Sequence, residues 1–131
     1  MSPKSLIQSF RDAQARLVVQ TSDLPLGTLA DMVESGGIDL QPGFQRRERW
    51  SIEKQSALIE SFLLNVSVPP VYLAEEESGT YSAIDGKQRL RTIAEYMSGR
   101  LSLKSLSRLV EAEGLRFGDL PTEISNALRL T

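Results

Sequence analysis

Five consecutive residues, Asp85-Gly86-Lys87-Gln88-Arg89, combine side chains that could bind a phosphate group. They follow a stretch that alternates like a strand and precede a segment with helical spacing of apolar residues. The first N–H groups of a helix lack partners within the helix and lie at the positive end of its dipole, so such a turn favours anions. Gly86 lets a ligand approach the backbone closely, while Lys87 and Arg89 offer a point charge and a planar fork suited to phosphate oxygens.

The same residues allow a purely structural interpretation. Asp85 would cap the following helix, Gly86 would only form the turn, and Lys87, Arg89 and Arg91 would be solvated charges on the helix surface. A turn followed by a basic helix start is common in proteins of many functions. Local sequence alone leaves both interpretations open.

A second candidate is the basic stretch of residues 45–50, Gln-Arg-Arg-Glu-Arg-Trp, which contains the only tryptophan of the chain. Arginine and tryptophan both present flat faces that could stack on a base, and arginine also binds phosphate. For Trp50 we favour the structural alternative, in which it packs into the core. Arg46 is the stronger binding candidate, because it stands beside Gln45 in a turn that follows Pro42-Gly43.

Three consecutive acids, Glu75-Glu76-Glu77, could suggest a metal site. Adjacent carboxylates on a turn rarely converge on one ion, and no second acidic cluster completes a coordination shell. We therefore expect a solvated hairpin tip.

Composition excludes several classes of chemistry. The 131 residues include no Cys and no His, so disulfides, thiolate nucleophiles, Cys-ligated or His-ligated zinc sites and Ser-His-Asp catalysis are excluded. The formal net charge of -2 means that any attraction to nucleic acid would need a local basic patch. The length favours one domain, and 40% apolar residues suffice for a core.

No membrane partner is expected from the sequence. The longest uncharged stretch, residues 61–74, has 14 residues and contains Pro69-Pro70, so it is too short to span a bilayer. The first residues lack the apolar core of a secretory signal, and we therefore expect a cytoplasmic location.

Apolar periodicity and turn residues predict a mixed α/β fold. A helix is expected over residues 28–35, and a second helix follows the N-cap Ser51. Residues 6–17 could form a helix or an arm, and residues 101–109 could form the start of a strand or a short helix. The remaining predicted elements are a strand at 38–40, a hairpin of strands at 71–74 and 80–84, a helix after Gly86 that Gly99 ends, and a final helix after Pro121-Thr122.

Several segments form a recognisable series along the chain. They are Ile38-x-Leu40-x-Pro42-x-Phe44-Gln45-Arg46, Trp50, Leu58-Ile59-x-Ser61-Phe62-Leu63, Val68-Pro69-Pro70-Val71-Tyr72-Leu73 and Ile84-Asp85-Gly86-Lys87-Gln88-Arg89-Leu90-x-Thr92-Ile93. In this order and spacing they resemble one known family, the N-terminal domain of GmrSD-type modification-dependent restriction endonucleases, which is a ParB/sulfiredoxin-like domain. The resemblance covers residues 25–128. It implies a mixed α/β (α+β) domain over residues 25–131, with a small sheet and surrounding helices, after an N-terminal arm or extra helix over residues 1–24.

The resemblance implies a nucleotide site. In such proteins an Asp-Gly-Gln-Gln-Arg motif is associated with binding and hydrolysis of nucleoside triphosphates in phage defence. This motif corresponds to Asp85, Gly86, Gln88 and Arg89, and Lys87 replaces its first glutamine, which could mark a copy that binds without hydrolysing. Hydrolysis would need a metal such as Mg²⁺ and a group that orients water. As the only acid of the motif, Asp85 is the candidate for the catalytic and metal-contacting role.

The resemblance also implies that Gln45 and Arg46 face the same pocket. With two arginine-bearing motifs directed to one cleft, the phosphate-binding interpretation of the turn is favoured. We further expect that nucleotide occupancy orders residues 44–50 against the turn and thereby controls a partner nuclease.

Partner predictions follow from what the chain lacks. Family members commonly carry a C-terminal nuclease domain with a His-based motif, and this chain has no His, so a nuclease would be a separate domain or subunit. Sulfiredoxin chemistry is excluded because it needs a Cys. The family domain usually continues past Leu128, which implies a shortened copy, a fragment or a subunit. The alternatives are a DNA-binding or scaffolding module without a nucleotide, and a fragment that forms homo-oligomers through apolar surface at residues 124–130.

Overall fold

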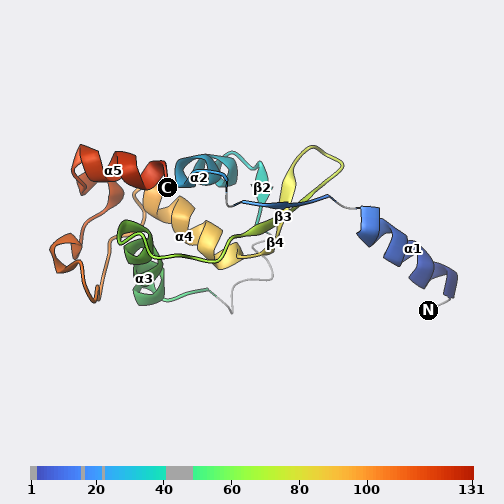
Figure 1. Ribbon diagram of the computed structural model, residues 1–131, viewed down its shortest axis with the longest axis horizontal. Coiled ribbons are helices and arrows are strands. Elements are labelled where there is room, and N and C mark those ends of the chain that lie inside the picture. Colours follow the sequence, from blue (N-terminus) through green and yellow to red (C-terminus); the bar gives the residue numbers. More distant parts are fainter. Residues whose placement is uncertain (1–2, 16, 22, 41–48) are drawn as a thin grey trace.

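A small mixed sheet with helices around it forms the fold (Figure 1). The computed structural model describes residues 3–15, 17–21, 23–40 and 49–131. Four strands lie in the order β1-β3-β4-β2, with β2 parallel to β4 and the other pairs antiparallel. This arrangement confirms the predicted fold class. The strands are β1 Val18–Gln20, β2 Ile38–Asp39, β3 Tyr72–Glu75 and β4 Tyr81–Asp85, and the helices are α1 Pro3–Ala15, α2 Leu26–Glu34, α3 Ile52–Leu63, α4 Lys87–Met97 and α5 Thr122–Arg129.

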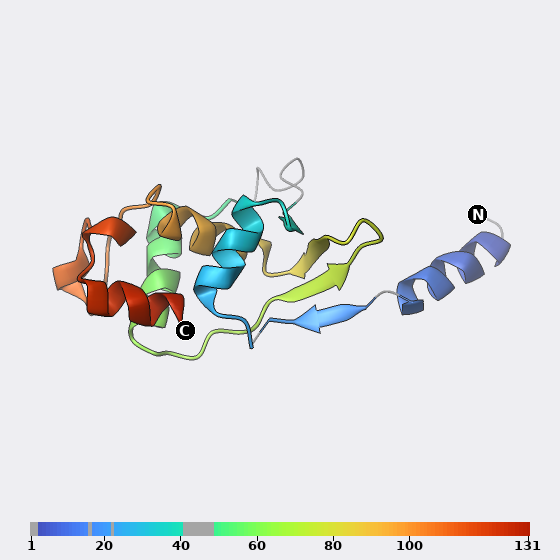
Figure 2. The ribbon, with the colours of Figure 1, turned by 90° about the horizontal axis from the view of Figure 1, so that it is seen from above.

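Helix α4 is the centre of the core. Its apolar residues repeat with helical spacing, and Leu90, Ile93 and Tyr96 are each at most 2% exposed. Helices α2 and α3 pack against α4, and Figure 2 shows these helices grouped at one end of the molecule. Ile59 of α3 and Leu73 of β3 complete the same buried cluster. The core therefore fixes the start of α4 relative to the end of β4.

The predicted hairpin is confirmed. Strands β3 and β4 pair antiparallel, with an irregularity in register between Tyr72 and Leu73. The tip is solvated as expected, since Glu75 and Glu77 are exposed, while Glu76 accepts a hydrogen bond from the Ser82 hydroxyl at 2.6 Å. Among the residues that the structure describes, no group of three or more acids could hold a metal ion.

The two ambiguous segments have different structures. The first forms α1, which Figures 1 and 2 show apart from the other helices, with Leu6 and Phe10 each more than 60% exposed. The second is irregular, although Leu103 and Leu106 within it are buried. Within the described ranges, no helix is long and apolar enough to cross a membrane.

A buried carboxylate from α3 holds the irregular segment in place. Glu60 is 5% exposed and accepts hydrogen bonds from the backbone N–H groups of Arg108 and Leu109 at 2.8 Å each. Ser107 donates to it from both its N–H and its hydroxyl, at 3.3 and 3.2 Å. These bonds, that of Leu109 first, lower the pKa of Glu60 below its usual value although burial opposes the change. The segment is thus ordered by a charge rather than by regular backbone pairing.

We expect Glu60→Gln to lower the free energy of unfolding by about 2–3 kcal/mol at neutral pH, because hydrogen bonds to a charged acceptor are lost and an amide N–H group faces backbone donors. Denaturation in urea at several pH values measures this. The folded-state pKa of Glu60 is lowered, so its contribution is present above the unfolded-state pKa and disappears as pH falls through the folded-state value. The difference between the natural sequence and the variant should narrow on acidification; a constant difference would contradict this role.

Candidate functional site

The turn between β4 and α4 has a backbone conformation that requires glycine. Gly86 is the N-cap of α4, with φ 93°, in the left-handed region. A β-carbon at Gly86 would lie 2.7 Å from Cγ2 of Val71 and 2.9 Å from Nη2 of Arg89. Because Gly86 occupies the N-cap, Asp85 does not take the capping position of the structural interpretation. Asp85 is instead the last residue of β4, and its side chain is 70% exposed.

Arg89 points into the protein from the first turn of α4. Its side chain is only 18% exposed, so the interpretation of Arg89 as a solvated surface charge is wrong. Nη2 donates to the carbonyl oxygen of Pro70 at 3.2 Å, and the nearest carboxylate oxygen, on Asp85, is 3.9 Å away. The Nε–H group is buried and has no hydrogen-bond partner among the residues that the structure describes. Within the same residues, the one ion pair of Arg89 is the long contact with Asp85.

A polar cavity of about 320 Å³ opens at this turn. It is lined by residues 84–89 and by Trp50. The side-chain oxygen of Gln88 accepts a hydrogen bond from the backbone N–H of Trp50 at 3.3 Å, whereas its buried Nε2 group has no hydrogen-bond partner among the described residues. Buried donors without partners are uncommon in folded proteins. Gln88 and Arg89, which both line this cavity, each have one such donor.

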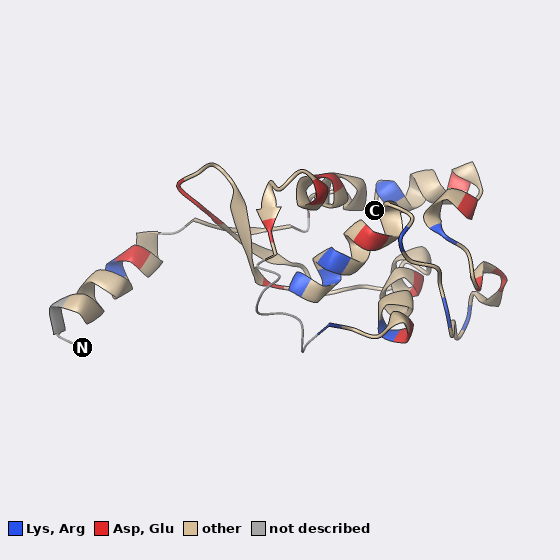
Figure 3. Cartoon of the chain, turned by 180° about the vertical axis from the view of Figure 1, so that it is seen from behind, with Lys and Arg blue, Asp and Glu red and all other residues tan. Residues whose placement is uncertain are grey.

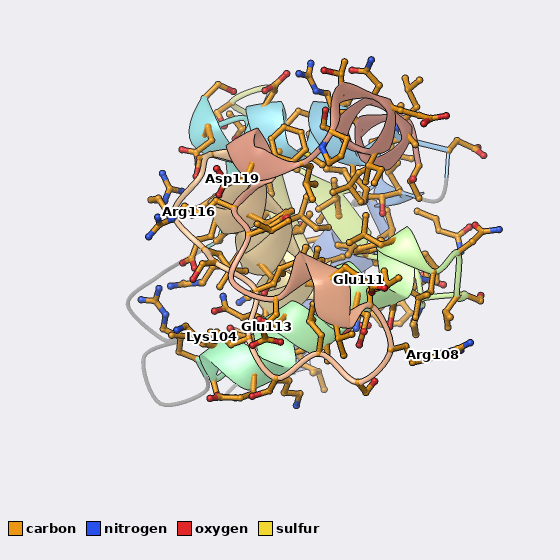
Figure 4. The ribbon with its side chains drawn as sticks, turned by 90° about the vertical axis from the view of Figure 1, so that its left-hand side faces the viewer. Lys104, Arg108, Glu111, Glu113, Arg116 and Asp119 are labelled. Carbon is orange, nitrogen blue, oxygen red and sulfur yellow. The ribbon has the colours of Figure 1, made fainter. Side chains whose placement is uncertain are left out.

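Two cations line this cavity. Figure 3 shows Lys and Arg on the N-terminal half of α4, where Lys87 and Arg89 line this cavity, whereas Arg91 lines another one. In contrast, Figure 4 shows Lys104, Arg108 and Arg116 spread around the edge of the opposite end of the molecule. The cations of that end do not converge on one point. The turn at Asp85 is therefore the better place for an anion.

Trp50 differs from the expectation that it packs into the core. It is half-buried, does not belong to the buried apolar cluster and lines the polar cavity. The ammonium group of Lys54 lies 4.8 Å from the centroid of its ring. The sequence held a signal for this position, since Trp50 precedes the N-cap Ser51 and so stands outside the apolar face of α3.

Residues 41–48 precede Arg49 and Trp50 in the sequence and lie outside the described residues. The proposed roles of Gln45 and Arg46 and the predicted ordering of residues 44–50 against the turn thus stay predictions. The first described residue after it, Arg49, forms an ion pair with Glu95 of α4 at 2.7 Å. Sequence reasoning did not identify Glu95, which belongs to no motif and is seven residues beyond Gln88 on α4.

Arg89 also lines a second cavity, of about 560 Å³, on the side of Pro69 and Pro70. Its other walls are largely apolar and include Phe62 and Leu29. The smaller cavity, by contrast, brings together Asp85, Lys87 and the amide of Gln88. Its donor set, rather than its size, makes it the candidate site.

Comparison with known proteins identifies one related family. The profile of the GmrSD restriction endonuclease N-terminal domain matches residues 6–128. The match includes the turn at Asp85 and the 45–50 stretch, and it confirms the resemblance drawn from the sequence motifs. Neither the curated proteins nor the solved structures compared with the chain contain a match.

Two glycines with similar backbone conformations allow strain to be separated from steric contact. Gly86→Ala should lower the free energy of unfolding by about 1–2 kcal/mol from left-handed strain and by about 1–3 kcal/mol more from contact with Val71 and Arg89. Gly79→Ala, at φ 85° with nothing within 4 Å, should show only the first loss. Urea denaturation of both variants measures the difference; equal losses would mean that the close packing at Gly86 has no energetic weight.

Proposed function

Because the chain belongs to the family of GmrSD restriction endonuclease N-terminal domains, we propose that it is a nucleoside-triphosphate-binding sensor module of a restriction or defence system. The family supports the coarser part of this proposal, a module of such a system. The nucleotide part is supported by the chemistry of the turn between β4 and α4. The residues proposed to bind phosphate are Gly86, Lys87, Gln88 and Arg89, with Gln45 and Arg46 from outside the described residues.

The buried guanidinium of Arg89 carries the proposal. Removing a charge from water costs several kcal/mol unless an opposite charge or full hydrogen bonding compensates. Among the described residues, Arg89 has one carbonyl partner, a carboxylate 3.9 Å away and an Nε–H group without a partner. A phosphate at the cavity would supply both the missing charge and the missing acceptors.

The surrounding groups favour phosphate over other anions. The N-terminus of an 11-residue helix directs its first N–H groups toward the turn, and Gly86 allows close approach to the backbone. Lys87 and Gln88 line the same cavity, so a cation and an amide also belong to its wall. Several donors around a tetrahedral ligand with three free oxygens match a terminal phosphate better than a single carboxylate.

We propose Asp85 as the contact for Mg²⁺. It is the only carboxylate among the described residues that line the cavity. Mg²⁺ usually keeps several waters and binds one or two carboxylates together with the phosphates of its ligand, so one exposed Asp fits this role. Asp85 is also the residue proposed to orient water if hydrolysis occurs, since the described lining holds no other general base.

The partners proposed are a nuclease domain or subunit and DNA, as the family suggests. The chain contains no His, so a nuclease reaction that needs a histidine base would take place in the partner. In this arrangement the domain would report nucleotide occupancy to the nuclease. A DNA-binding module without a nucleotide is the alternative, and it differs in its response to salt.

The test removes the charge of Arg89 and keeps its apolar packing. Arg89→Met should weaken binding of Mg²⁺-ATP, GTP, CTP or UTP at least about tenfold, because charge-assisted hydrogen bonds are lost. Titration calorimetry with each nucleotide measures the affinity. The variant should remain folded, because methionine can fill the space beside Val71 without burying a charge.

Arg100→Met is the matched control, since Arg100 is an exposed arginine paired with Glu34. It should bind triphosphate like the natural sequence. Equal binding by the natural sequence and by Arg89→Met, or DNA affinity that depends steeply on salt and is unchanged by triphosphate, would contradict the proposal.

A further inference from the structure

We propose that Trp50 contacts the base of the bound nucleotide and that Glu95 is the positioning residue that holds Trp50 at the cavity. This inference rests on the proposed function, because it assigns the second half of the same ligand. The phosphates occupy the end of the cavity formed by Lys87 and Arg89, and the base lies against Trp50 and Ile84.

The first step is the uneven chemistry of the cavity. Trp50 and Ile84 are its two large apolar side chains within the described residues, and its other walls are polar, charged or glycine. Ile84 is 50% exposed near the end of β4, whereas Ser82 and Ala83 before it are buried. An exposed isoleucine and a half-buried tryptophan in one polar cavity form an apolar patch beside cations. A planar heteroaromatic ring attached to phosphates has the same distribution of polarity.

The second step is the stacking chemistry of Trp50. An aromatic side chain binds a nucleobase by stacking, which tolerates different bases because each has a π-face. Lys54 lies over the ring at 4.8 Å, so the tryptophan is already packed against one flexible side chain. The ring remains only half-buried in the domain itself. Contact with a base would bury apolar surface that the fold leaves in water.

The third step is the bracing of Trp50 from α4. Glu95 is 15% exposed, and its carboxylate accepts hydrogen bonds from Arg49 at 2.7 Å and from the buried amide of Gln55 at 3.1 Å. Arg49 precedes Trp50, whose own N–H donates to Gln88. Two adjacent residues are therefore tied to the same helix that carries Arg89. Glu95 is not among the described residues that line the cavity, so we assign it an indirect role through Arg49, the neighbour of Trp50.

The experiment compares two ligands that share phosphates and differ in the base. Calorimetry measures Mg²⁺-tripolyphosphate and the tightest-binding Mg²⁺-nucleoside triphosphate with the natural sequence and with Trp50→Leu. The variant should bind the nucleotide about tenfold more weakly, since loss of one base–aromatic stack has this size. Its affinity for tripolyphosphate should stay within about twofold. Trp50→Phe, which keeps an aromatic face, should recover most of the nucleotide affinity.

Glu95→Gln tests the positioning role. It should weaken nucleotide binding without weakening tripolyphosphate binding, and the double variant with Trp50→Leu should be no weaker than Trp50→Leu alone, because both changes act on one contact. Since Trp50 is the only tryptophan, its fluorescence in Glu95→Gln should change before ligand is added. Glu34→Gln is the matched control, because it removes an ion pair with Arg100. It should change neither the nucleotide affinity nor the fluorescence of Trp50.

The outcomes separate the two proposals. Equal weakening of both ligands by Trp50→Leu, or no weakening of the nucleotide, overturns the assignment of the base and leaves the phosphate site intact. Additive losses in the double variant overturn the positioning role of Glu95. If the natural sequence binds neither ligand, the proposed function fails, and the base assignment fails with it.

Discussion

A largely buried guanidinium with incomplete hydrogen bonding is the constraint on which the candidate site depends. Arg89 can face inward only because β4 ends at Asp85, Gly86 turns in the left-handed region and Pro70 supplies a carbonyl oxygen. The core residues of α4 hold this arrangement, since Leu90 directly follows Arg89 and is fully buried. Rotation of the helix that released Arg89 to water would expose Leu90 and Ile93, so apolar burial keeps the cation inside.

Glu60 is a second buried charge, and it differs from Arg89 because its role is structural. Glu60 is almost fully buried, yet four donors from Ser107, Arg108 and Leu109 surround its carboxylate. That charge is satisfied within the chain, and it orders a segment that has no regular backbone pairing. Within the described part of the chain, Arg89 has no comparable set of partners. Complete satisfaction is typical of a structural group, and the shortfall at Arg89 is the feature on which the proposed phosphate site rests.

The sequence predicts the fold where local patterns determine it and fails where distant contacts do. Helix α3 and its N-cap Ser51, and the hairpin of β3 and β4, follow from periodicity and turn residues. The three-residue β1 is too short to leave a pattern, and it exists because it pairs with β3. Residues 101–109 have leucines that suit a helix or a strand, but their N–H groups bond to the distant Glu60 and to Glu113. For the site, the motif predicted the turn, while the inward direction of Arg89 and the role of Glu95 depend on three-dimensional packing.

The charged residues of α4 are placed opposite to the order that its dipole favours, and this placement favours an external anion at its N-terminus. Helices are stabilised by acids in the first turn and bases in the last turn, and each such charge is worth about 0.3–1 kcal/mol. In α4 the first turn has no acid and carries Lys87 and Arg89, the last turn has no base, and Glu95 lies near the end. This order of charges does not stabilise the folded helix. A bound phosphate would make the electrostatic energy at the helix start favourable, because the anion would contact both the cations and the helix N-terminus. Lys87 places a second cation in this first turn and would add to the attraction for an anion.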